Sequence, residues 1–280
     1  MSTIEAHARP NGYALGHTPE EYERLRAQAL VWEPSTGRLL DEVALAPGAS
    51  CLDAGCGPGE TMRAMADRVG PTGRVHGIDA DASLGAIALE RLHGAGHRQC
   101  TFQPHDLTAL APIPGGPFDV VYARLLLFHL RERAAVLERL WDAVAPGGHL
   151  IVQDYDLHGM CVLPALDSVD EVMRVFTEAF TAAGCDVRVG TRLPEVFAQA
   201  GVGEPDGTDV AGRLEPLATG RAILERTFRS VLPSALARGI ISENNAIRTL
   251  AAIECDADRF PDRPMLWPLM IGAWKRRNDA

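Results

Sequence analysis

The chain has 280 residues, 46% of them hydrophobic, and its 27 basic and 37 acidic residues give a net charge of −10. Such a chain can fill the core of a large α/β domain, and its acidity argues against a nucleic-acid partner, because binding a phosphate backbone requires clustered lysine and arginine. No apolar run approaches the roughly 18 residues of a membrane span, and the first residues lack a signal-peptide pattern. We therefore expect a cytoplasmic protein with no membrane partner.

The cysteines indicate no disulfide framework and no metal site. The six cysteines form no CxxC pair, so we expect most of them to be reduced core residues. His93, His97 and Cys100 lie close together in the sequence, but the glycines between the histidines argue against a helical ligand pair. We expect a solvated loop there and no bound metal.

Strand-like runs alternate with helical ones over the first half of the chain. Residues 19–33 begin with proline and two glutamates, which suit the first turn of a helix, and a second helical stretch covers about 35–45. The patterns then predict strands at 50–55, 74–79, 100–106, 118–124 and 149–154, with helices near 59–69, 83–93 and 131–144. This alternation predicts parallel strands with right-handed crossovers, and hence an α/β fold with an open doubly wound sheet.

The second half of the chain is predominantly helical. Helical patterns occur at about 166–183, 192–200, 219–237 and 243–257, before a strand-like run at 268–274. Such an insertion would sit over the carboxyl edge of the sheet, where open α/β folds bind ligands. We therefore divide the chain into an N-terminal helical segment, a cofactor-binding core, a largely helical substrate cap and a final strand that completes the sheet, at 1–48, 49–156, 157–260 and 261–280.

A glycine-rich turn follows the first predicted strand. The stretch "CLDAGCGPGETM" carries glycine at positions 55, 57 and 59. Glycine here costs conformational entropy and adds no buried surface, but it lets a ligand approach the main chain at the start of a helix. The turn therefore predicts that a cofactor lies against this backbone.

Acidic residues lie in or at the end of three successive predicted strands, at Asp53, Asp79 and Asp106. Asp79 lies about 20 residues beyond the last glycine of the turn, the distance at which an acid can accept hydrogen bonds from ribose hydroxyls. Each of them alone is equally typical of a helix cap or a turn. A dinucleotide is the alternative ligand, but the spacing is GxGxG rather than GxGxxG, and acidic strand ends repel phosphate.

Several motifs together resemble those of class I S-adenosylmethionine-dependent methyltransferases. The first is "LDAGCGPGE", and "GIDAD", "HDL", "FDVVYARLLLFHL" and "LWDAVAPGGHLIVQD" follow in order. The opening "GYALGHTPEEYERLRAQALVWEP" and the closing "PLMIGAWKRR" are similar to bacterial ubiquinone-methyltransferase-like enzymes that act on small molecules. The resemblance implies a Rossmann-like, mostly parallel seven-stranded sheet with a helical cap inserted before the last strand, and S-adenosyl-L-methionine as cofactor.

The resemblance also implies which residues hold the cofactor. Asp53 would hold the methionine end, Asp79 the ribose and Asp106 the adenine amino group, while Tyr22 and Arg26 could close over the cofactor or simply belong to the core. The full set implied to bind the cofactor is Tyr13, Asp53, Gly55, Gly57, Asp79, Ala80, Asp106, Leu107 and Arg124.

Candidate catalytic residues follow the fourth and fifth strands, at His129, Asp154 and Tyr155. Methyl transfer needs a base only for a phenol, a hydroxyl or an acidic carbon, and a histidine with a pKa near ~6.5 could supply one. A buried or helix-capping histidine is the alternative, and the run after residue 153 could equally be a turn with polar side chains bonded to the backbone.

We expect methyl transfer to an O, N or C atom of a small, apolar or aromatic metabolite of the natural-product type, because aromatic and Met residues in the insertion could line a covered cleft. An inactive methyltransferase-like binding or regulatory protein is one alternative, and an NAD(P)-dependent oxidoreductase is another. The acceptor's identity is left open, as is assembly into a homodimer.

Overall fold

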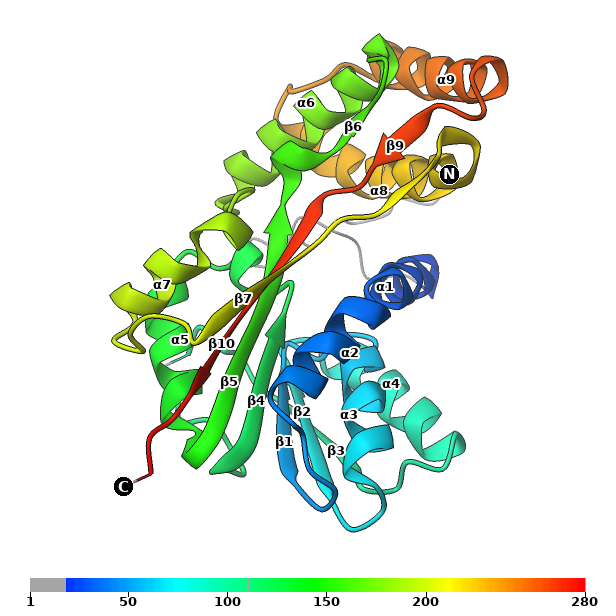
Figure 1. The fold of residues 1–280 in the computed structure, drawn as a ribbon. Helices are drawn as coiled ribbons and strands as arrows, with labels where there is room; N and C mark the ends of the chain where they lie inside the picture. Colours follow the sequence, from blue (N-terminus) through cyan, green and yellow to red (C-terminus); the bar gives the residue numbers. More distant parts are fainter. Residues whose placement is uncertain (1–18, 110, 280) are drawn as a thin grey trace.

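Parallel strands form the centre of a seven-stranded sheet in the computed structural model, which describes residues 19–109 and 111–279 (Figure 1). Its strands, in the spatial order β3-β2-β1-β4-β5-β10-β7, are Cys100–Pro104, Arg74–Asp79, Ser50–Ala54, Phe118–Arg124, Val144–Asp156, Leu269–Arg276 and Gly207–Ala211. The strands β1 to β5 run parallel, whereas β10 lies antiparallel to both β5 and β7. The strand order reverses at β1, so the carboxyl ends of β1 and β4 flank the crevice where doubly wound folds bind ligands.

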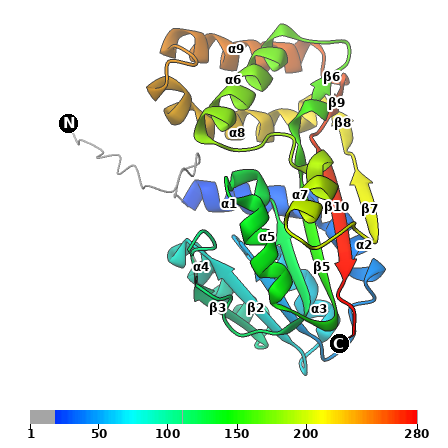
Figure 2. The same cartoon turned by 90° about the vertical axis from the view of Figure 1, so that its left-hand side faces the viewer.

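Helices cover both faces of this sheet, as Figures 1 and 2 show. These helices are α2 (Glu33–Glu42), α3 (Glu60–Val69), α4 (Ala82–Gly94), α5 (Arg133–Asp142) and α7 (Leu193–Gln199), while α1 (Pro19–Val31) lies across the carboxyl edge (Figure 1). Successive side chains of the central strands point to opposite faces of the sheet. Cys51 and Val120 pack with α2 and α3, while Leu52 and Val121 pack with α5 and α7. Strands buried on both faces must be apolar almost throughout, which explains the continuous apolar runs of the sequence.

A cap stands over the carboxyl edge of the sheet (Figure 1). It contains the helices α6 (Asp167–Ala183), α8 (Leu217–Ala237) and α9 (Glu243–Arg259) and a small antiparallel sheet of β6 (Cys161–Val162), β9 (Pro264–Leu266) and β8 (Leu214–Pro216). Phe176 of α6 and Phe228 of α8 lie 6.2 Å apart between ring centroids and are buried in the cap's core. Short 3-10 turns, η1 (Leu127–His129), η2 (Leu157–Gly159) and η3 (Gly190–Arg192), connect the elements.

The structure confirms the expected doubly wound, mostly parallel seven-stranded sheet. The cap is largely helical, and the short strands β6, β8 and β9 pair within it. The range 157–260 also contains β7, which is an edge strand of the main sheet, and α7, which packs against that sheet. The pattern missed β7 because this edge strand is short and carries Gly207 and Asp209, residues that are depleted in strands.

Two further observations concern the described part of the chain. No helix in it is both long and apolar enough to span a membrane. All the cysteines are free thiols, and His93 bonds the carbonyl oxygen of Cys100 while His97 faces Asp67, so these residues do not converge on one point.

Candidate functional site

The glycine turn after β1 adopts the left-handed backbone that favours glycine. The φ angles of Gly55, Gly57 and Gly59 are +72°, +49° and +81°. A Cβ atom at Gly55 would lie 3.0 Å from Leu126, and one at Gly59 would lie 3.1 Å from Ala88, so these two glycines permit close packing. A Cβ atom at Gly57 would meet nothing within 4 Å. Gly57 therefore faces open space, where a ligand can reach the main chain.

Asp79 links the end of β2 to this turn. Its Oδ2 accepts a hydrogen bond from the Gly57 N–H at 2.9 Å, and its Oδ1 accepts one from the Asp81 N–H at 2.8 Å. Burial raises the pKa of the Asp79 carboxyl, and these backbone donors oppose the rise. The structure thus brings Asp79 and Gly57 together, with the exposed Ala80 next to them.

Asp53 of β1 is only 1% exposed, and its Oδ2 has no hydrogen-bond partner. Burial raises the pKa of this carboxyl to about 7, the Arg124 guanidinium lowers it, and the Asp79 charge raises it further. A buried oxygen without a partner is costly. An incoming group with N–H donors and a positive charge would satisfy Asp53 and restore its ionised form.

Asp106 and Leu107 follow β3 at the same edge. Oδ1 of the half-buried Asp106 accepts hydrogen bonds from the backbone N–H and the hydroxyl of Thr108, at 2.8 and 2.7 Å, so Asp106 also holds a local turn. Leu107 is buried, and its carbonyl oxygen accepts a hydrogen bond from Arg139. Asp106 therefore stabilises the turn after β3, at the edge where the adenine is predicted to lie.

Arg124 ends β4 and reaches toward the N-terminal helices. Its guanidinium donates to the carbonyl oxygen of Ala29 and to the hydroxyl of Thr36, both at 3.2 Å. Its charge also acts on Asp53. Arg124 therefore fastens α1 and α2 to the edge of the sheet, close to the carboxylate that the cofactor would meet.

Helix α1 lies across this edge. Tyr22 accepts a hydrogen bond from Arg91 of α4 at 3.0 Å, and Arg26 pairs with Glu60 of α3 at 2.9 Å. These contacts place α1 over the helices that flank the glycine turn. Tyr13, which was also expected here, lies outside the described residues.

His129 occupies the short turn η1 after β4. It is half-buried, and its Nδ1 lies 3.9 Å from the Cys185 Sγ. Burial lowers the pKa of His129 to about 4, and the positive charge of Arg24 contributes to the lowering. His129 is therefore neutral at neutral pH, and it is a weaker base than an ordinary histidine.

The geometry of Asp154 favours the backbone-bonded interpretation over a catalytic one. The side chain is 0% exposed, Oδ2 accepts the Phe128 N–H at 3.1 Å and Oδ1 accepts the Tyr155 N–H at 3.0 Å. Burial raises its pKa to about 7. Asp154 thus holds the turn that carries His129, rather than facing a substrate.

Tyr155 connects β5 to α1. Its hydroxyl oxygen accepts hydrogen bonds from Gln28 Nε2 at 2.9 Å and from the Trp32 indole N–H at 2.6 Å, and the Trp32 and Tyr155 rings meet edge to face. Burial raises the pKa of Tyr155, so the phenol is protonated at neutral pH. The side chain is a buried anchor for α1 in this arrangement.

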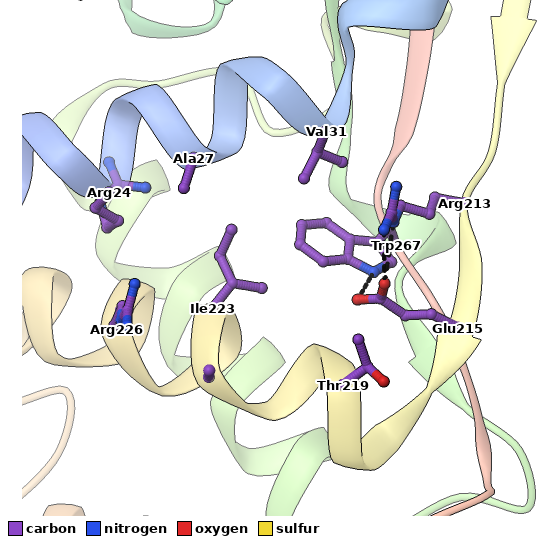
Figure 3. Close-up of a pocket in the computed structure, with 10 residues that line it drawn as sticks. Arg24, Ala27, Val31, Arg213, Glu215, Thr219, Ile223, Arg226 and Trp267 are labelled. Atoms are coloured by element: carbon purple, nitrogen blue, oxygen red, sulfur yellow. Dashed lines mark hydrogen bonds and ion pairs between the residues drawn. The ribbon is translucent and has the colours of Figure 1, made fainter.

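A pocket opens between α1 and α8 (Figure 3), with a volume of about 200 Å³. It is lined by Arg24, Ala27, Val31, Arg213, Glu215, Thr219, Ala222, Ile223, Arg226 and Trp267. Of the aromatic and Met stretches expected to line a cleft, the largely buried Trp267 lines this pocket, whereas Phe176, Phe228 and Met265 are buried and do not line it. The arginines were missed, since charged residues on helices are usually solvated and only the packing of distant segments brings these together.

Residues 51–148 match a protein family model described as a methyltransferase domain. The chain is similar to trans-aconitate 2-methyltransferase from Paracidovorax citrulli, with 38% identity over 115 residues, which cover 41% of this chain and 42% of that protein. It is also similar to phosphoethanolamine N-methyltransferase 1 from Arabidopsis thaliana, with 29% identity over 64% of this chain and 34% of that protein. The chain thus aligns with less than half the length of these relatives.

Solved structures share the architecture at low sequence identity. A Bacillus halodurans C-125 protein superposes with a TM-score of 0.58 at 16% identity, covering 87% of this chain and 98% of that one. At such identity the likeness shows the fold alone. This shared fold and the match of residues 51–148 to a methyltransferase domain both agree with the class I methyltransferase motifs of the sequence.

Proposed function

We propose that this protein transfers a methyl group from S-adenosyl-L-methionine to an O, N or C atom of a small organic molecule. One observation carries the proposal. Within the segment that matches a methyltransferase domain, Gly57 faces open space beside the Asp79 carboxylate, and the buried Oδ2 of Asp53 lacks a partner. This edge offers carboxylates and open main chain to a ligand that carries positive charge.

The residues present fit this cofactor. Asp53 would take the ammonium group of its methionine end, because a cation supplies the donors that Oδ2 lacks. Asp79 would accept hydrogen bonds from the ribose hydroxyls, and Asp106 with Leu107 would meet the adenine. Ala80, Gly55 and Arg124 complete the predicted set, and Tyr13 extends it outside the described residues. The bound cofactor supplies a methyl group on a sulfonium, a good electrophile.

The chain's own contribution is alignment and the exclusion of water. Helix α1 covers the edge, where Tyr155 fastens it to β5 and Glu60 fastens it to α3. Neutral His129 can accept a proton from an acidic acceptor, while Asp154 fixes the turn that presents it. An acceptor that is already nucleophilic needs no base.

The acceptor is proposed to carry an apolar or aromatic part. Support comes from Ala27, Val31, Ile223 and Trp267, which line the pocket between α1 and α8. The relatives are named for methylating trans-aconitate and phosphoethanolamine, which are polar molecules. The biosynthetic role, the cytoplasmic location and a homodimer stay predictions from the sequence.

Isothermal titration of the full chain with S-adenosylhomocysteine tests the proposal, together with a parallel titration with NADH. We expect saturable binding of S-adenosylhomocysteine and none of NADH. The reverse result would establish the oxidoreductase alternative. Binding of S-adenosylhomocysteine without turnover on any member of an acceptor panel would favour the inactive, regulatory alternative.

A further inference from the structure

We propose that the pocket between α1 and α8 binds an anionic group, a carboxylate or a phosphate, on the small acceptor. This inference rests on the proposed methyl transfer and names the chemical class of its acceptor. Arg24 comes from α1, Arg226 from α8 and Arg213 from the residue just before β8, so segments far apart in the sequence place three guanidinium groups around one space (Figure 3).

The charge of the pocket is opposite to that of the chain. The chain carries a net charge of −10, yet the described residues that line the pocket include three arginines and a single carboxylate, Glu215. Glu215 is already paired with Arg213, at 3.0 Å. Arg226 is exposed and makes no ion pair with any described residue. Glu225, the carboxylate next to it in the sequence, pairs with Arg221 instead. A positive surplus in an acidic protein attracts anions selectively.

Arg24 and Arg226 lie apart from the aromatic wall of the pocket, whereas Arg213 lies beside Trp267 (Figure 3). In the view of Figure 3, Arg24 and Arg226 lie at one end, Trp267 lies at the other, and Val31 and Ile223 point into the space between the helices. An acceptor with an anionic end and an apolar body would match this division. The volume of about 200 Å³ is below the roughly 300–1,000 Å³ of typical ligand pockets, so the acceptor must be small.

The Trp267 wall is fixed before any ligand arrives. Its indole N–H donates to Glu215 Oε1 at 2.7 Å, and its backbone N–H donates to the Arg213 carbonyl oxygen at 2.9 Å. The Arg213 guanidinium lies 5.9 Å from the centre of the Trp267 ring. Because these contacts already order the side chains, binding loses little conformational entropy at this wall.

Arg24 connects the pocket to the edge of the sheet. It is 4% exposed and donates to Gln28, one turn further along α1, whose side chain in turn donates to the Tyr155 hydroxyl. The charge of Arg24 also acts on His129. An anion held at Arg24 therefore lies near the residues that end β4 and β5, where the methyl group would be transferred.

Titration of the full chain, preloaded with S-adenosylhomocysteine, tests the inference with phenylacetate, phenyl phosphate and the neutral phenylacetamide as probes. We expect one or both anions to bind and the amide not to bind. Arg226→Met should weaken anion binding by about tenfold or more, because it removes a charged donor. Arg226→Lys should restore part of the affinity. The matched control is Arg229→Met, which removes a charge from an exposed position on the same helix outside the pocket and should change little.

The outcomes separate the inference from the proposed function. Comparing the affinities for phenylacetate and phenyl phosphate shows which anionic group the pocket prefers. Binding of the amide as tightly as the acid, no binding of either anion, or equal effects of Arg226→Met and Arg229→Met would overturn the anion site, even where S-adenosylhomocysteine binds normally. If the protein binds the anions but not S-adenosylhomocysteine, the methyltransferase proposal is wrong and the anion site is supported. Thermal melting of each variant confirms that it is folded.

Discussion

The edge of β1 and β2 and the pocket between α1 and α8 differ in charge and in construction. The edge presents Asp53 and Asp79, whereas the pocket presents Arg24 and Arg226. The edge is built from the ends of adjacent strands and one turn, while the pocket joins α1 and α8, two helices that are far apart in the sequence. Under the two proposals above, a cationic cofactor and an anionic acceptor would bind to separate surfaces of opposite charge, so that neither ligand would compete for the other's place.

The two regions share α1, which touches both of them. Its residues Tyr22 and Arg26 contact α4 and α3 beside the glycine turn, while Arg24 and Ala27 line the pocket. Gln28 near the end of α1 and Trp32 just after it both donate to the buried Tyr155 hydroxyl, which therefore helps to hold α1 in place. Variants that act on the edge alone, or on α1, can therefore separate the contributions of the two regions.

The largest effect is expected from Asp79→Ala. The variant removes an acceptor for ribose hydroxyls as well as the bond to Gly57, and we expect the affinity for S-adenosylhomocysteine to fall by about 1–3 kcal/mol. Calorimetric titration measures it. Asp81→Ala is the control, since it removes the N-cap of α4 at the same edge but no predicted ribose contact. Equal losses in the two variants would mean that the ribose lies elsewhere.

Gly57→Ala separates backbone strain from ligand contact. Alanine at φ +49° costs about 1–2 kcal/mol of folding stability, and its Cβ would occupy the open space beside the turn. Gly201→Ala is the matched control, because Gly201 also has a positive φ, +71°, and an added Cβ there would meet nothing within 4 Å. Chemical denaturation should give similar losses of stability for the two variants, and titration should show weakened S-adenosylhomocysteine binding only for Gly57→Ala. Unimpaired binding by Gly57→Ala would show that the cofactor does not approach this glycine.

The pH dependence of cofactor binding should report on Asp53. Because burial raises the pKa of this carboxyl to about 7, it is protonated below that pH, and pairing with an ammonium requires the proton to leave. Affinity for S-adenosylhomocysteine should therefore rise with pH up to about 7 and then level off, changing by up to about 1.4 kcal/mol per pH unit below it.

Titrations with S-adenosylhomocysteine at pH values from about 5.5 to about 8.5 measure this dependence, because the raised pKa of Asp53 lies within that range. Asp53→Asn should abolish it. Asp154→Asn is the control: the pKa of Asp154 is also raised to about 7, but its oxygens bond backbone N–H groups away from the predicted cofactor contacts. A slope that persists in Asp53→Asn would assign the proton to another group.

The smallest effect is expected from Tyr155→Phe. Loss of the hydroxyl removes the acceptor for Gln28 and Trp32, and we expect the free energy of unfolding to fall by about 1 kcal/mol. A positioning role predicts a raised KM for the acceptor with a nearly unchanged kcat at saturation, and faster amide exchange in α1. A large fall in kcat with an unchanged KM would instead mark Tyr155 as catalytic.

The sequence by itself determined the parallel core of the sheet and the glycine turn. Cys51 to Asp79 contain a strand, a turn, a helix and a second strand in consecutive order, and each is specified by local periodicity and by residues with special backbone preferences. The carboxyl ends of parallel strands meet at one edge whatever else the chain does. The closeness of Gly57 and Asp79 could therefore be predicted without coordinates.

Only the tertiary structure decided how the polar side chains are used. Asp53 and Asp154 look alike in sequence, each within a buried strand, but Asp53 keeps an oxygen without a partner while Asp154 bonds two backbone N–H groups. The meeting of Arg24, Arg226 and Trp267 likewise depends on how α1, α8 and the segment after β9 pack. Such contacts join residues about 200 positions apart, and no local pattern encodes them, because long-range packing selects which of many exposed charges face one another.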